Sequence, residues 1–153
     1  MIIHMDLLEL TREGAREFVY GMEDALRQAP QVEIPVEHYF AHGLYMRKIF
    51  IPAGVALTGR VHRQDDLQIM FYGDLAILGE DGTFRRFTGP NQFTSKAGVK
   101  PFAVAYEDTL WATVHHTHLT DLEEINKELF FEDNCLFDFA TGHVKEELPC
   151  QHP

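Results

Sequence analysis

The chain has 153 residues, which is enough for one hydrophobic core and short of two. Its apolar content of 45% excludes a disordered chain, and 13 basic against 24 acidic side chains give a formal net charge of −11. So acidic a surface repels phosphate backbones and anionic lipids. We therefore expect neither a nucleic acid nor a membrane as a partner.

The start of the chain and its cysteines predict a cytoplasmic location. No stretch reaches the roughly 18 consecutive apolar residues that cross a bilayer, and Asp6 and Glu9 interrupt a start that lacks the basic residues of a signal peptide. The two cysteines, Cys135 and Cys150, are typical of reduced thiols. We expect a single domain over 1–153, with a helical arm (1–43), a β-barrel (44–118) and a C-terminal helix and tail (119–153).

The first third predicts a helix from Thr11 to Ala29. Its apolar side chains recur at steps of three and four residues, which places them on one face. Thr11 is the predicted N-cap and Pro30 the stop. Residues 31–43 contain Pro35 and predict a loop or an edge strand.

The middle of the chain predicts eight short antiparallel strands. Segments rich in Val, Ile, Phe, Tyr and Thr alternate with turn residues every 8 to 12 positions or so. No helical pattern separates them, so the sheet is expected to close on itself or to double. The predicted strands are Tyr45–Ile51, Ala56–Val61, Leu67–Tyr72, Leu75–Gly79, Thr83–Phe87, Gln92–Ser95, Phe102–Tyr106 and Thr109–His116.

The end of the chain predicts a short helix followed by an apolar tail. Thr120 and Glu123 have the spacing of a capping box, with Thr120 as the N-cap. Leu122, Ile125, Leu129 and Phe130 supply its buried face. The apolar residues at 136, 137 and 139 are expected to pack on the body or on a partner chain.

The sequence around residue 60 carries a motif with defined spacing. Gly54 is followed after five residues by Arg60, Val61 and His62, after three more by Asp66, and after six more by Gly73. A second stretch, Lys96-Ala97-Gly98-Val99-Lys100-Pro101, keeps a turn glycine.

These two stretches resemble the motifs of the cupin superfamily. In the first, Arg60 stands where the family has a histidine ligand and Asp66 where it has glutamate; in the second, Pro101 replaces the last histidine ligand. The resemblance implies an all-β fold, a cupin-like double-stranded β-helix or jelly-roll barrel, here with an N-terminal helix and a short C-terminal helix. The chain also looks like small cupin-like proteins carried by bacteriophages.

The spacing has a physical meaning of its own. Residues two apart on a strand face the same side, so Arg60 and His62 are expected to look into one space, with Asp66 returning nearby. Gln68 is in phase with Asp66. A barrel of this size can enclose one small ligand.

The first functional hypothesis is a metal-free pocket for a small polar or anionic molecule. Arg60 supplies a fork for a carboxylate or phosphate, while His62, oriented by Asp66, is the candidate acid–base group for isomerase- or epimerase-like proton transfer. No cofactor is expected under this hypothesis. The further ligand-binding candidates are Gln68, Tyr72, Glu107 and His115.

Two alternatives stay open. A divalent metal, as in a dioxygenase-like cupin enzyme, would take His62, Asp66 and His115 as ligands, although a nearby Arg60 would repel the ion. A non-enzymatic protein would use the barrel to sequester a ligand or to support an assembly. In each case the helical arm and the apolar tail favour a homodimer. Whether the chain is an enzyme is not decided by the sequence.

Overall fold

The computed structural model describes residues 12–79 and 81–131, together with the backbone of 137–138 and 143–144. It contains two helices and nine strands, in chain order: α1 (Arg12–Gln28), β1 (Val36–Ala41), β2 (Leu44–Ile51), β3 (Ala56–Thr58), β4 (Asp66–Leu78), β5 (Phe84–Thr88), β6 (Asn91–Ser95), β7 (Phe102–His116), α2 (Leu122–Leu129), β8 (Phe137–Asp138) and β9 (His143–Val144). Cys135, Cys150 and the side chains of the apolar tail lie outside the described residues, so the predictions made for them are not tested.

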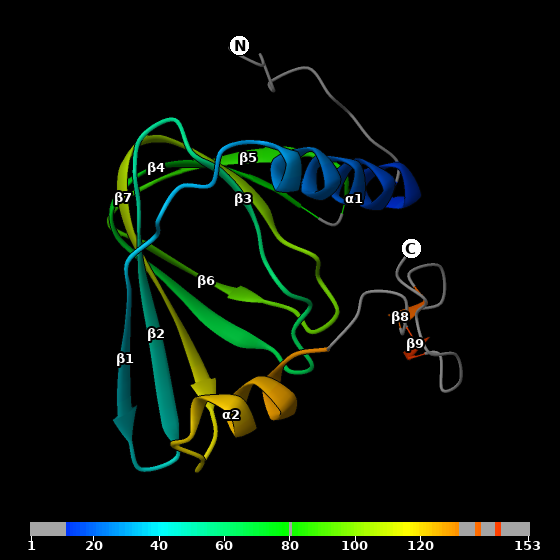
Figure 1. Ribbon diagram of the computed structural model, residues 1–153. Coiled ribbons are helices and arrows are strands. Elements are labelled where there is room, and N and C mark those ends of the chain that lie inside the picture. The colour runs from blue at the N-terminus through cyan, green and yellow to red at the C-terminus, as the bar shows by residue number, and fades with distance from the viewer. Residues whose placement is uncertain (1–11, 80, 132–136, 139–142, 145–153) are drawn as a thin grey trace.

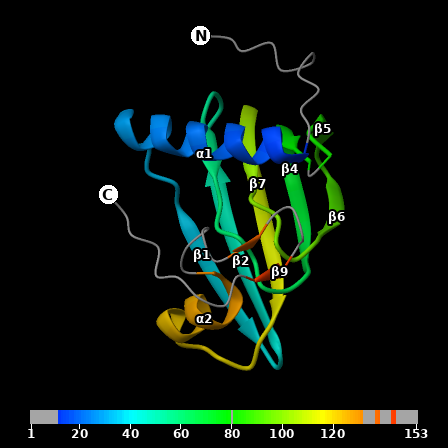
Figure 2. The same cartoon turned by 90° about the vertical axis from the view of Figure 1, so that its right-hand side faces the viewer.

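The fold is a mainly β, antiparallel jelly roll with an N-terminal helix and a short C-terminal helix, as the sequence predicted (Figure 1). Seven strands form one sheet in the order β1-β2-β7-β4-β5, with β3 also paired to β7 and β6 also paired to β4. α1 and α2 lie near opposite ends of the long strands (Figure 2). No helix within the described ranges is long and apolar enough to span a membrane.

Two long strands correct the predicted boundaries. The segments predicted as 67–72 and 75–79 are one strand, β4, and those predicted as 102–106 and 109–116 are one strand, β7. Each long strand changes partner halfway: β4 pairs with β6 in its first half and with β5 in its second, while β7 pairs first with β3 and then with β2. The turn residues between the predicted pairs bend the strands without ending them, because β4 and β7 stay paired to each other across the bend.

Gly73 makes this bend. Its φ is +121°, and a Cβ at this position would lie 2.6 Å from the Cα of Thr109 on β7. Only glycine fits both the backbone angle and the close approach. The pairing of β4 with β7 is irregular on both sides of Gly73, which lets the sheet fold over and enclose a space.

The remaining corrections are smaller. β3 ends at Thr58 rather than at Val61, so Arg60 and His62 lie on the connection between β3 and β4. Residues 36–41 form the edge strand β1, one of the two outcomes predicted for that stretch. α2 begins one residue later than predicted, because the side chain of Asp121, not that of Thr120, accepts a hydrogen bond from the Glu124 N–H at 3.0 Å.

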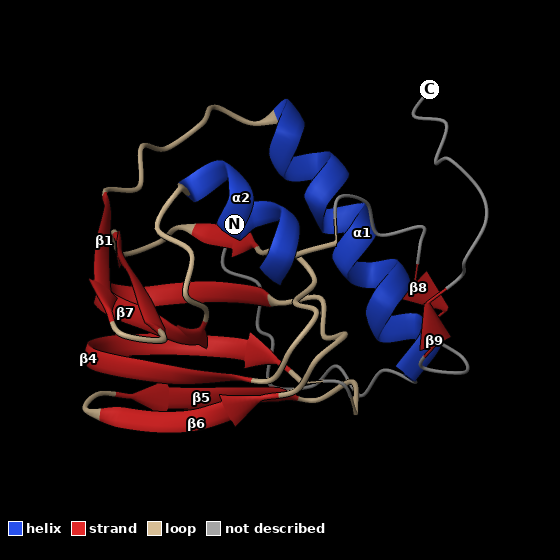
Figure 3. Ribbon diagram, turned by 90° about the horizontal axis from the view of Figure 1, so that it is seen from below, coloured by secondary structure: helices blue, strands red, loops and turns tan. Residues whose placement is uncertain are grey.

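The helices pack through most of their predicted apolar faces, although Leu122 of α2 is 41% exposed and not buried as predicted. α1 sets Ala15 and Val19 against Leu78 and Phe102 of the sheet, and the buried Lys100 forms a 2.9 Å ion pair with Glu23 of this helix. Ile125 and Leu129 of α2 pack against Tyr45 of β2. Figure 3 shows most of the strands on one side of the molecule and both helices on the other.

Candidate functional site

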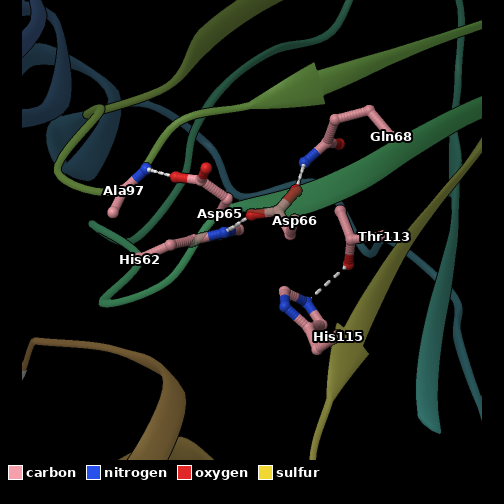
Figure 4. A network of polar contacts seen from close by, with 7 residues as sticks. All are labelled: His62, Asp65, Asp66, Gln68, Ala97, Thr113 and His115. Carbon is pink, nitrogen blue, oxygen red and sulfur yellow. Dashed lines mark hydrogen bonds and ion pairs between the residues drawn. The ribbon is translucent and has the colours of Figure 1, made fainter.

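His62 and Asp66 form a close pair between the connection after β3 and the start of β4 (Figure 4). The Nδ1 atom of His62 contacts Oδ2 of the buried Asp66, and the amide of Gln68 donates to the other carboxylate oxygen. Asp66 and Gln68 are two residues apart on β4 and therefore face the same side. The carboxylate thus holds the imidazole in one orientation, which leaves Nε2 as the ring atom available to a ligand.

The backbone fixes His62 from the other side. It pairs with Phe130 in an isolated antiparallel bridge, and the Phe130 ring meets the imidazole edge-on with 4.9 Å between centroids. The Gly98 N–H donates to the His62 carbonyl at 2.9 Å. Chain segments just after α2 and after β6 therefore position this histidine.

His115 approaches the pair from β7. Its ring centroid is 5.2 Å from that of His62, its Nε2 lies 3.0 Å from the Thr113 hydroxyl, and the residue is 3% exposed. Burial lowers the pKa of His115 to about 4, and the His62 charge acts in the same direction while that of Asp66 opposes it. His115 is therefore a neutral imidazole at neutral pH.

Together these residues form a group with the chemistry of a metal-binding triad. Each of the three residues His62, Asp66 and His115 offers one ligand atom, and these three atoms lie within 4.8 Å of one another. No other such group of three occurs among the described residues. Two histidines and one carboxylate suit a divalent transition metal, and a neutral His115 has a free lone pair to offer. The donor set therefore fits a metal, although both Asp66 oxygens already accept a hydrogen bond from the protein.

The group opens onto a large cavity inside the folded sheet. Its volume is about 1020 Å³, at the upper end of the range of small-molecule sites. His62, Gln68 and Thr113 line its polar part. The apolar part is lined by Ile49, Leu57, Ile77, Phe87, Phe93 and Trp111.

The predicted site residues separate into two sets. Arg60, His62 and Gln68 line the cavity, with Asp66 and His115 beside them. Tyr72 is 47% exposed and lies outside the cavity lining, because the irregular pairing after Met70 shifts the alternation of β4. Glu107 is exposed, opposite Asp74 at the bend, and does not line the cavity.

Two residues that line the cavity, Arg47 and Trp111, were not among the predicted site residues. Arg47 lies on β2 between the inward-facing Tyr45 and Ile49, and it lines the cavity with them. The signal was present in the sequence. Arg47 is two residues from Tyr45 and from Ile49 on a predicted strand, and residues two apart on a strand share a face. Trp111 is largely buried and lines the same cavity.

No protein-family model and no curated protein matches the sequence. Among solved structures, ectoine synthase from P. lautus has a TM-score of 0.53 at 14% identity, over 67% of this chain and 78% of that chain. A cupin from Shewanella frigidimarina has a TM-score of 0.48 at 19% identity (62% and 89% of the two chains). Acetylacetone dioxygenase from Acinetobacter johnsonii has a TM-score of 0.47 at 12% identity (57% and 66%).

The topology and the comparison with ectoine synthase define the fold. The chain has a jelly-roll fold similar to that of ectoine synthase, so the resemblance seen in its motifs is confirmed at the level of fold. At these identities the likeness shows the fold alone, because one fold hosts many activities. The resemblance to bacteriophage proteins stays a prediction.

Proposed function

We propose that this protein binds a small anionic molecule in the barrel cavity and moves a proton on it with His62. The observation that carries the proposal is one cavity that holds Arg60, His62 and Gln68 together, with Asp66 behind the imidazole. A positioned imidazole whose partner carboxylate fixes its orientation is the base-and-orienter half of an acid–base site.

The roles follow from the contacts. The guanidinium of Arg60 lies over the ring of Phe130, 5.5 Å from its centroid, at the same aromatic side chain that supports His62. An anion held by Arg60 is thereby brought to His62, whose Nε2 accepts or returns a proton while Asp66 stabilises the imidazolium. Neutral His115 and Gln68 supply uncharged hydrogen-bonding groups beside the reacting atoms.

The test is a thermal-shift and calorimetric screen against organic carboxylates, sugar nucleotides and nucleotides, followed by mass and NMR analysis of each bound compound after long incubation. We expect at least one compound to raise Tm and to be isomerised or to exchange a carbon-bound proton with D2O. His62→Ala should abolish the exchange. The matched control is His116→Ala. His116 follows His115 on β7 and faces the outer side of the sheet, so this variant should leave the proton exchange intact.

Two outcomes contradict the proposal. If no compound raises Tm in the screen, the cavity does not serve as a ligand site. If a compound binds but returns unchanged with no proton exchange, the chain sequesters its ligand and the acid–base role of His62 is wrong.

A second candidate function is metal-dependent catalysis, and the clustering of His62, Asp66 and His115 favours it. These three residues would hold a divalent ion, with Gln68 and Thr113 orienting Asp66 and His115. A bound ion would supply a Lewis acid at this end of the cavity.

Elemental analysis and titration of the purified chain with Fe²⁺, Mn²⁺, Zn²⁺ and Ni²⁺ test this candidate. If this candidate is right, the parent chain should bind one ion per chain. His62→Ala and His115→Ala should lose this ion, and His116→Ala should keep it. A metal content well below one ion per chain after titration with each of the four ions would exclude it.

A further inference from the structure

Two arginines face the cavity, and neither has a negative partner within the described part of the chain. Arg47 comes from β2 and Arg60 from the connection after β3, and both line the cavity. Among the described residues, neither guanidinium forms an ion pair with a carboxylate. The acidic groups near the cavity already have other partners, since Glu23 pairs with Lys100, Asp81 with Arg85, and Asp66 with His62.

The position of Arg47 is electrostatically unfavourable unless an anion lies beside it. Its side chain is partly removed from water, and burial together with the nearby charge of Arg60 lowers the pKa of Arg47. A partly buried cation beside a second cation costs stability unless an anion compensates it. Carboxylates outnumber cations in this chain, whose formal net charge is −11. A cavity arginine that pairs with none of the described carboxylates therefore points to an anionic ligand.

Two neutral groups in the wall of the same cavity also lack hydrogen-bond partners within the described ranges. The Oε1 atom of Gln68 and the Nε1 atom of Trp111 are buried, and neither has a hydrogen-bond partner among the described residues. Both side chains line the cavity and are at least nine-tenths buried. A buried acceptor and a buried donor without partners, both in a cavity wall, point to a ligand that supplies the missing partners.

The register of the sheet arranges these groups in rows on the cavity face. Arg47 pairs with Thr113, which pairs on its other side with Gln68, so these three form one row across β2, β7 and β4. His115 pairs with Tyr45 in the row on one side. The row on the other side consists of Ile49, Trp111 and Met70. Neighbouring rows are about 7 Å apart, since they are two residues apart along a strand.

We propose that the Arg47 row is an anion-binding subsite, and that the ligand is a small hydroxy- or amino-carboxylate with an apolar body. The carboxylate accepts hydrogen bonds from Arg47, from Arg60 and from the Nε1–H of Trp111. The hydroxyl or amine donates to Gln68, and the apolar body packs on the ring of Trp111. This placement leaves the carbon next to the carboxylate over the Arg47 row, one row from His115. The inference rests on the proposed function and names the class of ligand for the same cavity.

Trp111 makes the inference directly measurable because it is the only tryptophan of the chain. The probes are mandelate and phenylalanine, with mandelamide as the neutral analogue and inorganic phosphate as the anion without an apolar body. We expect mandelate or phenylalanine to change Trp111 fluorescence saturably. Mandelamide and phosphate should each bind at least tenfold more weakly, since a charge-assisted pair with arginine is lost in one and the apolar contact in the other.

Arg47→Gln is the decisive variant, and Lys48→Gln is its matched control, since Lys48 is the next residue and faces the opposite side of β2. Arg47→Gln should weaken the binding of mandelate or phenylalanine about tenfold or more and raise Tm of the ligand-free protein, because an uncompensated cation is removed. Lys48→Gln should change the affinity less than twofold. The rise in Tm also shows that the variant folds.

Each contrary result has its own meaning. If Arg47→Gln binds the probes as Lys48→Gln does, or lowers Tm without weakening binding, Arg47 has a structural role and the subsite is wrong while the proposed function stands. Phosphate binding as tightly as mandelate overturns the apolar part of the inference. If neither mandelate nor phenylalanine changes Trp111 fluorescence while another compound in the wider screen raises Tm, the ligand class is wrong. Failure of every compound in that screen contradicts the proposed function itself.

Discussion

Asp66 is the residue on which the candidate site depends most directly. Its two oxygens contact the imidazole of His62 and the amide of Gln68, so one carboxylate orients both neighbours. The spacing of four residues between His62 and Asp66 indicated this pair in the sequence. The third member, His115, was a candidate whose direction depended on the register of β7, and that register faces it inward.

His115 predicts a pH dependence of stability. In the folded protein its pKa is about 4, below the unfolded value of 6.5, so between these values the unfolded chain binds more protons and acid favours unfolding. In metal-free protein, lowering the pH from 7 to 5 should cost about 2 kcal/mol of unfolding free energy through this group. Urea titrations at the two pH values measure it. His115→Phe should remove this part of the pH dependence while His116→Phe retains it, and equal slopes for both variants would contradict the assignment.

At the scale of elements, the bend in β4 and β7 creates the site. Because β4 continues past Gly73, one strand supplies both Gln68 and Ile77 to the cavity wall, with Asp66 beside it. The irregular pairing also explains why Tyr72 is outside the cavity lining although simple alternation from Asp66 would place it inside.

Gly73→Ala tests the bend. The new Cβ would meet the backbone of Thr109, and the alanine would have to adopt the positive φ of Gly73. We therefore expect the unfolding free energy to fall by at least about 2 kcal/mol. Gly21→Ala on α1 is the control, since a Cβ there meets nothing within 4 Å and should stabilise the helix by up to about 1 kcal/mol. Chemical denaturation of both variants decides the matter, and a Gly73→Ala protein as stable as the parent would show that the bend does not need glycine.

At the scale of the whole molecule, the outer face of the sheet carries an exposed apolar patch. Leu44 and Leu67 are 50% and 42% exposed, and Met46 and Val114 lie between them in register on the side away from the cavity. An exposed apolar face of a sheet is typical of a surface that another protein covers. We propose that a second copy of the chain covers this patch. The homodimer predicted from the sequence stays a prediction.

The net charge gives this dimer a specific dependence on salt. Two chains with a formal charge of −11 each repel one another, and salt screens that repulsion. Light scattering should therefore show a tighter dimer at about 0.5 M salt, where the Debye length is a few Å, than at about 0.02 M. Leu67→Lys should give a monomer at both concentrations. A parent chain that stays monomeric at high salt and high concentration would exclude the dimer.

The sequence by itself determined the β-rich fold, the two helices and the local pair of His62 and Asp66. Alternation, turn residues and short spacing are local properties, and local properties are what a sequence pattern expresses. Only the tertiary structure decided that β4 and β7 are continuous, that Arg47 shares the cavity with Arg60, and that His115 meets His62. These arrangements depend on register and on an irregular bend between strands distant in the sequence, where a shift of one residue moves a side chain to the opposite face.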